Sequence, residues 1–94
     1  MPTKGVPRAM NKLEELTAQR KRAHAQLLAG KSKVYEGFLA MEKAAYCDGA
    51  LSKKQKELIA VGISVVKNCE SCMQWHIEQA AAEGATFEEL LEAI

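Results

Sequence analysis

The spacing of apolar positions along the chain predicts helices. From Lys12 to Leu28, apolar side chains recur every three or four residues among Lys, Arg, Glu and Gln, which is typical of a helix with one buried face. Gly30 follows as a helix stop, and Ser32 can cap a second helix that is stopped by Asp48-Gly49. The second helix repeats the same spacing at Val34, Phe38, Met41 and Ala45.

Two capping boxes predict helix starts in the second half of the chain. Ser52 with Gln55, and Thr86 with Glu89, each place a hydroxyl three residues before a longer polar side chain, so that both can satisfy backbone groups at a helix start. The helix after Ser52 should run to about Lys67. Because this helix is apolar on nearly all sides, we expect it to be the most buried element.

A further helix is predicted between these two. Asn68 is a good N-cap, residues 70–83 contain no Gly or Pro, and Gly84 supplies a C-terminal stop. No stretch shows the alternation of a strand. We therefore expect an all-α fold, a small helical domain over residues 1–94 that oligomerises, with residues 1–10 flexible and the last helix cut short at residue 94.

Composition excludes several function classes. A net charge of +1 with mixed signs gives no basic surface for nucleic acid. The apolar runs are too short to span a bilayer, and the N-terminus lacks the apolar segment of a signal peptide. Three cysteines with one close pair do not resemble the framework of a secreted protein. We expect a cytoplasmic protein that binds neither nucleic acid nor membrane and needs no cofactor.

The segment Cys69-Glu-Ser-Cys72-Met-Gln-Trp-His76 carries the candidate chemistry. If it is helical, its two thiols lie one turn apart and its imidazole lies one turn beyond them, on the same face. Unpaired backbone N–H groups and the helix dipole favour a thiolate at the helix start. Two sulfurs that can form or break a disulfide therefore lie beside a base that can take up or return a proton.

Glu57 is a further candidate, near the start of the third helix and twelve positions before Cys69. An antiparallel hairpin of the third and fourth helices can bring Glu57 near the later turns of the fourth helix, where His76 lies. Exposure of Glu57 is the alternative, since most glutamates are exposed. Spacing alone leaves both interpretations open, because it does not give the register of the hairpin.

These residues resemble a known family. Glu57, then Cys69-x-x-Cys72 and His76, after Asp48-Gly-Ala-Leu-Ser52-Lys-Lys-Gln-Lys-Glu57-Leu-Ile and before Gly84-Ala-Thr, are similar to the AhpD-like branch of the carboxymuconolactone decarboxylase family. The resemblance covers about residues 38–94. It implies an all-α helical bundle that assembles into trimers or hexamers.

The resemblance also implies a chemistry, that of a thiol-dependent peroxidase or disulfide reductase. Cys72 would meet the oxidant, Cys69 would resolve it, and His76 with Glu57 would relay protons. A peroxide or disulfide substrate and an external thiol reductant are the implied partners. The helix dipole by itself favours Cys69 as the attacking thiol, and only the resemblance favours Cys72. Where some hydroperoxidase members carry a second histidine before the later cysteine, this chain has Ser71.

Other functions remain open from the sequence. Cys69, Cys72 and His76 could supply three zinc ligands with Glu57 as a fourth, but metal ligands more often come from separate elements, so we expect no metal. A non-enzymatic metal-binding or redox-sensing helical module is one alternative. A lyase of the carboxymuconolactone decarboxylase type is another.

Three more side chains receive structural interpretations. We expect Cys47 to be a small packing residue, His24 to be solvated, and Trp75 to serve packing or subunit contact.

Overall fold

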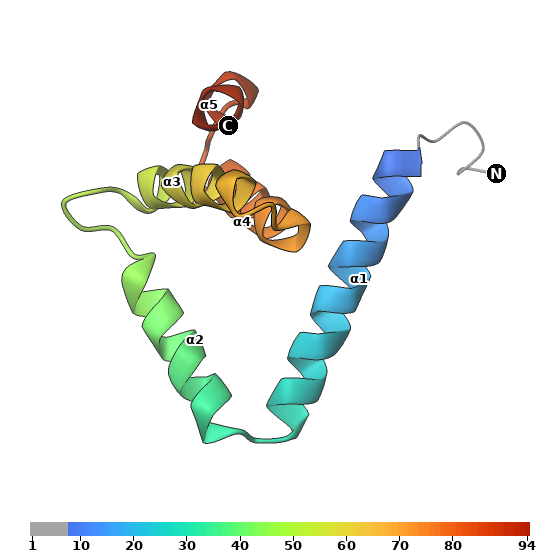
Figure 1. The fold of residues 1–94 in the computed structure, drawn as a ribbon. Helices are drawn as coiled ribbons and strands as arrows, with labels where there is room; N and C mark the ends of the chain where they lie inside the picture. Colours follow the sequence, from blue (N-terminus) through green and yellow to red (C-terminus); the bar gives the residue numbers. More distant parts are fainter. Residues whose placement is uncertain (1–7) are drawn as a thin grey trace. The chain divides into compact units, whose positions relative to one another are not determined.

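The structure, a computed structural model, describes residues 8–94, and these form five helices without a strand (Figure 1). The helices are α1 (Arg8–Ala29), α2 (Lys33–Ala45), α3 (Lys53–Val66), α4 (Glu70–Ala82) and α5 (Phe87–Ala93). The predicted all-α fold is confirmed. The prediction of flexibility for residues 1–10 concerns mainly residues 1–7, which lie outside the described residues, and α1 begins at Arg8.

The chain divides into two compact units, residues 1–36 and residues 37–94. In the first unit, the Tyr35 hydroxyl hydrogen-bonds Nδ1 of His24, and the two rings meet edge to face with centroids 5.7 Å apart. The Tyr35 backbone N–H donates to Ser32 Oγ at 3.2 Å, as expected for a residue that caps α2. The predicted solvation of His24 holds only in part, because the side chain is partly exposed and partly covered by its contact with Tyr35.

The second unit is organised around α3, which packs against α4 and α5 (Figure 1). The apolar side chains that are buried there are small: Ala60 and Val61 on α3 and Ala80 on α4. Small residues allow the two helix axes to approach closely, so α3 and α4 form the predicted hairpin.

Both predicted capping boxes are present. Ser52 Oγ accepts from the Gln55 backbone at 3.1 Å while Gln55 Oε1 accepts from the Ser52 backbone at 2.8 Å. Thr86 and Glu89 make the same exchange at 3.1 and 2.8 Å. The Thr86 backbone bond, followed by the bond from the Lys54 ammonium at 3.0 Å, lowers the pKa of Glu89 below its ordinary value. The same Lys54 contact ties α5 to α3.

The turn between α3 and α4 differs from the prediction at its cap. Asn68 adopts a left-handed conformation with φ of 53°, which asparagine tolerates better than most residues, and so it does not cap α4. The extended conformation that an N-cap needs falls on the next residue, Cys69, with φ of −105° and ψ of 98°. The prediction of Asn68 as N-cap is wrong, and the first cysteine takes that place.

Burial of α3 is less complete than its composition suggests. This helix holds most of the described buried residues, among them Glu57 and Ser64, but Ile59, Ile63 and Val66 are exposed in the single chain. These three recur at helical spacing and form one apolar stripe. A second stripe, on α5 and its C-cap residue, consists of Phe87, Leu91 and Ile94. The expectation that α3 is the most buried element is confirmed, although α4 and α5 leave one of its faces open in the single chain.

No helix within residues 8–94 combines the length and the apolar composition that a passage through a bilayer requires.

Candidate dithiol site

A disulfide joins Cys69 and Cys72 at the start of α4, with the two Cα atoms 5.2 Å apart. The Cys69 sulfur also accepts a hydrogen bond from the Cys72 backbone N–H at 3.3 Å, in the manner of an N-cap side chain. Cys72 is exposed and Cys69 is partly exposed. Cys47 is a free thiol, so the predicted pairing is confirmed, whereas its reversibility stays a prediction.

His76 lies one turn beyond Cys72 on α4, and the hairpin brings it against Glu57 of α3. The Nδ1 atom of His76 is 2.7 Å from Oε1 of Glu57, with the two side chains 16% and 3% exposed. An ionised carboxylate can only accept, so Nδ1 carries the hydrogen and Nε2 is the nitrogen that can take up a proton. Of the two interpretations of Glu57, exposure is wrong and the hairpin contact is present.

This contact explains how a carboxylate can lie in the core. Burying an ionised carboxylate is strongly unfavourable unless a hydrogen bond or an opposite charge compensates for the lost water. The imidazole of His76 supplies that partner, and it does so from a helix that also carries both sulfurs. A proton taken up by His76 would in turn be stabilised by the charge of Glu57. The pair can therefore hold an imidazole in one orientation and support its charged form.

Tyr46, in the turn that follows α2, is the residue that sequence reasoning missed. Its ring centroid lies 5.5 Å from that of His76, with the two planes inclined by 31°. Burial, and then the nearby carboxylates of Glu57 and Glu42, raise the pKa of Tyr46 above its ordinary value. The phenol is therefore neutral near pH 7. The spacing of residues along α4 could not have identified Tyr46, because Tyr46 lies in the turn after α2.

Lysine contacts fix the segment around Tyr46 to α3. The Lys56 ammonium donates to the backbone carbonyls of Ala45 and Cys47, at 3.0 and 2.7 Å. Further along the same turn, Asp48 Oδ1 accepts from the backbone N–H of Lys53 at 2.7 Å. Because Lys56 directly precedes Glu57, these bonds attach both flanks of Tyr46 to the turn of α3 that carries the buried carboxylate.

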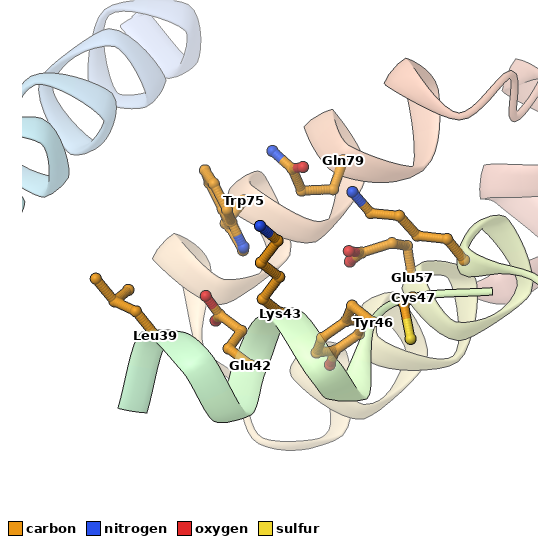
Figure 2. A pocket seen from close by; sticks show the side chains of 9 residues that line it. Leu39, Glu42, Lys43, Tyr46, Cys47, Glu57, Trp75 and Gln79 are labelled. Atoms are coloured by element: carbon orange, nitrogen blue, oxygen red, sulfur yellow. The ribbon is translucent and has the colours of Figure 1, made fainter. Parts of the chain in front are cut away.

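A pocket of about 280 Å³ is lined in part by this carboxylate (Figure 2). Its walls come from α2 and the residue pair after it, from α3 and from α4; the lining residues are Leu39, Glu42, Lys43, Tyr46, Cys47, Lys53, Glu57, Trp75 and Gln79. Neither disulfide cysteine is among them. Glu57 and Tyr46 thus border both the pocket and the imidazole of His76.

The pocket also includes two residues that the sequence analysis interpreted structurally, Cys47 and Trp75. Cys47 is exposed at its wall, and its thiol donates to the Ala44 carbonyl at 3.1 Å, so the prediction of Cys47 as a small packing residue is wrong. It lies in the turn beyond the end of α2, where its thiol stays exposed. Trp75 is partly buried and lines the same pocket.

Ser71 lies between the two cysteines, with its Oγ 3.7 Å from the Cys69 sulfur. A serine hydroxyl can hydrogen-bond a sulfur but does not titrate near neutral pH. In the part of the chain that the structure describes, no three His, Cys, Asp or Glu side chains converge as a group that could hold a metal ion.

Comparison with known proteins gives relatives that are themselves without an assigned activity. The chain is 46% identical over 59 residues to uncharacterized protein 4 in the cox locus of Paracoccus denitrificans, covering 63% of this chain and 53% of that protein. It is 44% identical over 57 residues to an uncharacterized protein of Cupriavidus necator, covering 61% and 50%. The chain spans about half the length of these curated relatives.

Solved structures show the same fold. A carboxymuconolactone decarboxylase family protein from Legionella pneumophila, crystallised in its apo form, superposes with a TM-score of 0.82 at 36% identity, covering 88% of this chain and 74% of that chain. A Thermotoga maritima protein gives 0.74 at 29% identity, with 85% and 70% covered.

The family follows from a match that spans more than half of the chain. Residues 32–94 match the profile of the carboxymuconolactone decarboxylase family, and this stretch contains α2 to α5 together with Glu57, both disulfide cysteines and His76. The resemblance inferred from the residues is thereby confirmed at the level of the family. This chain belongs to the carboxymuconolactone decarboxylase family.

Proposed function

We propose that the protein is a thiol-dependent redox enzyme of the alkylhydroperoxidase or disulfide reductase type, which cycles Cys69 and Cys72 between dithiol and disulfide. One juxtaposition carries the proposal. A solvent-accessible disulfide at a helix start lies one turn from an imidazole that a buried carboxylate holds through Nδ1. Helix N–H groups can stabilise a thiolate there, and His76 can accept its proton.

The first step takes place in the reduced protein. His76 accepts the proton of the Cys72 thiol at Nε2, and the thiolate attacks an oxygen of the peroxide. A sulfur–oxygen bond forms while the oxygen–oxygen bond breaks. The leaving alkoxide takes the proton from His76 and departs as an alcohol. Cys72 is oxidised to a sulfenic acid in this step.

Resolution follows within the same helical turn. The Cys69 thiolate attacks the Cys72 sulfur, the sulfur–oxygen bond breaks, and the hydroxide leaves as water after taking up the proton released by Cys69. The sum is one peroxide and two thiols converted into one alcohol, one water and one disulfide. An external thiol reductant then reopens the disulfide by exchange. With a disulfide substrate, the same attack releases a thiol and forms a mixed disulfide, which Cys69 resolves.

Exposure supports the assignment of roles. Cys72 is the more exposed of the two, so it can meet an oxidant, whereas Cys69 is partly covered and caps α4. The N–H of Cys72 that points at the Cys69 sulfur stabilises negative charge on that sulfur. A better-stabilised thiolate is the better leaving group when the disulfide is reopened at Cys72.

Mass mapping of the cysteines tests the cycle. The fully reduced protein is treated with one equivalent of an organic hydroperoxide, alkylated and digested. We expect a disulfide between Cys69 and Cys72 together with alkylated Cys47, and loss of one peroxide per disulfide formed. Cys47→Ser should behave as wild type, while Cys72→Ser should form no intrachain disulfide. A Cys47–Cys72 bridge as main product, or a dithiol that neither peroxide nor a small disulfide oxidises, would contradict the proposal.

Metal analysis separates this function from the metal-binding alternative. The purified protein should contain less than stoichiometric zinc, and its thiols should titrate fully without a chelator. Bound zinc that protects both cysteines from alkylation would favour the binding module instead.

We further propose that a second copy of the chain covers the apolar stripes of α3 and α5. Their six large side chains are exposed in the single chain, at helical spacing on adjoining helices, as in an interface between subunits. Light scattering at micromolar concentration should give a trimer or a hexamer. Leu91→Lys, on the α5 stripe, should shift the mass toward one chain, whereas Glu92→Lys, at the next and also exposed position, should not. A wild-type protein with the mass of one chain would refute the assembly.

A further inference from the structure

We propose that Tyr46 is a positioning residue for His76, whose aromatic ring holds the imidazole in place from one face and favours its protonated form. This inference rests on the proposed function, because it assigns a role within the proton transfer at the dithiol. Tyr46 acts through His76, whose ring it contacts.

Two contacts from two different elements define the orientation of the imidazole. Glu57 of α3 holds Nδ1 in the ring plane at 2.7 Å. Tyr46 lies across the ring, with centroids 5.5 Å apart and the planes inclined by 31°. The hydrogen bond alone would leave the imidazole free to rock about the bond to Glu57. The tilted tyrosine ring beside the imidazole restricts that motion, so Nε2 keeps a single direction for exchanging a proton.

The same ring affects the charge of His76. The face of an aromatic ring is negative, and a cation within about 6 Å of its centroid is attracted to it. The phenol of Tyr46 stays neutral at pH 7 because burial and the carboxylates of Glu57 and Glu42 raise its pKa. The ring also excludes water from one face of the imidazole, which strengthens its bond to Glu57. Both effects favour the imidazolium that forms when a thiol gives up its proton.

The charged and titratable groups around this pair come from three segments. They are Glu57 on α3, Cys69 and Cys72 on α4, and Glu42 on α2, with Lys43 and Lys53 at the adjoining pocket. Glu57 directly contacts His76. The two Lys56 bonds to the carbonyls on either side of Tyr46 keep the aromatic ring beside the imidazole, so its position does not depend on the ring contact alone.

The chain offers a matched control pair. Tyr35 also contacts a histidine, His24, with centroids 5.7 Å apart, but this pair lies in the first unit and its hydroxyl hydrogen-bonds the imidazole directly. A substitution of Tyr35 therefore removes a tyrosine–histidine contact with a comparable distance between ring centroids. The residues of the dithiol site stay unchanged.

The experiment measures alkylation of the reduced protein by iodoacetamide between pH 5 and 9, with the peptide that carries Cys69 and Cys72 followed by mass spectrometry. Tyr46→Leu should slow this alkylation roughly three- to ten-fold at neutral pH and move the rising limb of the profile to higher pH, because a less stable imidazolium supports less thiolate. Tyr46→Phe, which retains the ring, should stay within about two-fold of wild type. Tyr35→Leu should leave the profile unchanged.

Two results would overturn the inference. Identical profiles for wild type and Tyr46→Leu would remove the ring from the site, and a Tyr46→Phe profile as slow as that of Tyr46→Leu would assign the effect to the hydroxyl. If Tyr46→Leu does not fold, as judged by circular dichroism, Tyr46→Met supplies an unbranched side chain for the same comparison. The readout needs no peroxide turnover. A protein that fails to reduce peroxide but shows these shifts would refute the proposed enzyme while sustaining the role of Tyr46.

Discussion

Replacement of His76 by alanine should slow peroxide-driven oxidation of the dithiol by about 10²–10⁴-fold, the usual contribution of a positioned acid or base. The imidazole is the group placed to accept the thiol proton. Without it, only the backbone N–H groups at the start of α4 remain to stabilise the thiolate. Trp75, the single tryptophan, directly precedes His76, so its fluorescence can report disulfide formation in stopped flow. The rates of both proteins should be compared across pH, because loss of the imidazole should change the shape of the profile.

His24→Ala is the control for this variant, because His24 belongs to the first unit and makes its contact with Tyr35. It should keep the wild-type rate. Added imidazole should partly restore the rate of His76→Ala, since a free base can enter the space that the side chain leaves. A pH profile that does not change on loss of His76 would make this residue a bystander.

Glu57→Gln should slow the same reaction by about 10–100-fold. The amide can still accept from Nδ1 through its oxygen, so the imidazole keeps much of its orientation, but the negative charge that stabilises the imidazolium is gone. The loss should therefore appear mainly in the pH dependence of the rate, with little change in helix content. Glu57→Ala should be slower still, and it should also be less stable, because it leaves a cavity and a partly buried imidazole without its partner.

The matched control is Glu89→Gln. Glu89 is also a hydrogen-bonded carboxylate with a basic partner, Lys54, but it lies on α5 and does not contact His76. It should affect the stability of the last helix and leave the thiol chemistry unchanged. Full activity in Glu57→Gln would remove the carboxylate from the mechanism even though it lies 2.7 Å from the imidazole.

Local features of the sequence were sufficient for the helices and for the disulfide. The capping boxes at Ser52 and Thr86 form as predicted because both partners of each hydrogen bond lie within three residues. The pairing of Cys69 with Cys72 has the same basis, since one helical turn brings the two sulfurs together. Contacts between residues three positions apart can therefore be predicted directly from their spacing in the sequence.

The turn at Asn68 marks the limit of that reasoning. Both Asn68 and Cys69 can cap a helix, and the choice depends on the backbone path that closes the α3–α4 hairpin. The asparagine takes the left-handed position in the turn, so the cysteine becomes the cap. Residue preferences rank each position separately as an N-cap. They do not describe how the path of the turn decides between two neighbouring candidates.

Contacts between elements were decided by the tertiary structure. The bond between Glu57 and His76 depends on the register of α3 against α4, which is set by how the small side chains of Ala60, Val61 and Ala80 pack. The register had remained open because a shift of one turn leaves the apolar pattern of either helix unchanged. Tyr46 reaches the imidazole through a turn whose course follows from the Lys56 bonds. The sequence by itself therefore determined the helices and the dithiol, while the buried carboxylate and the aromatic ring became part of the site only through packing between helices.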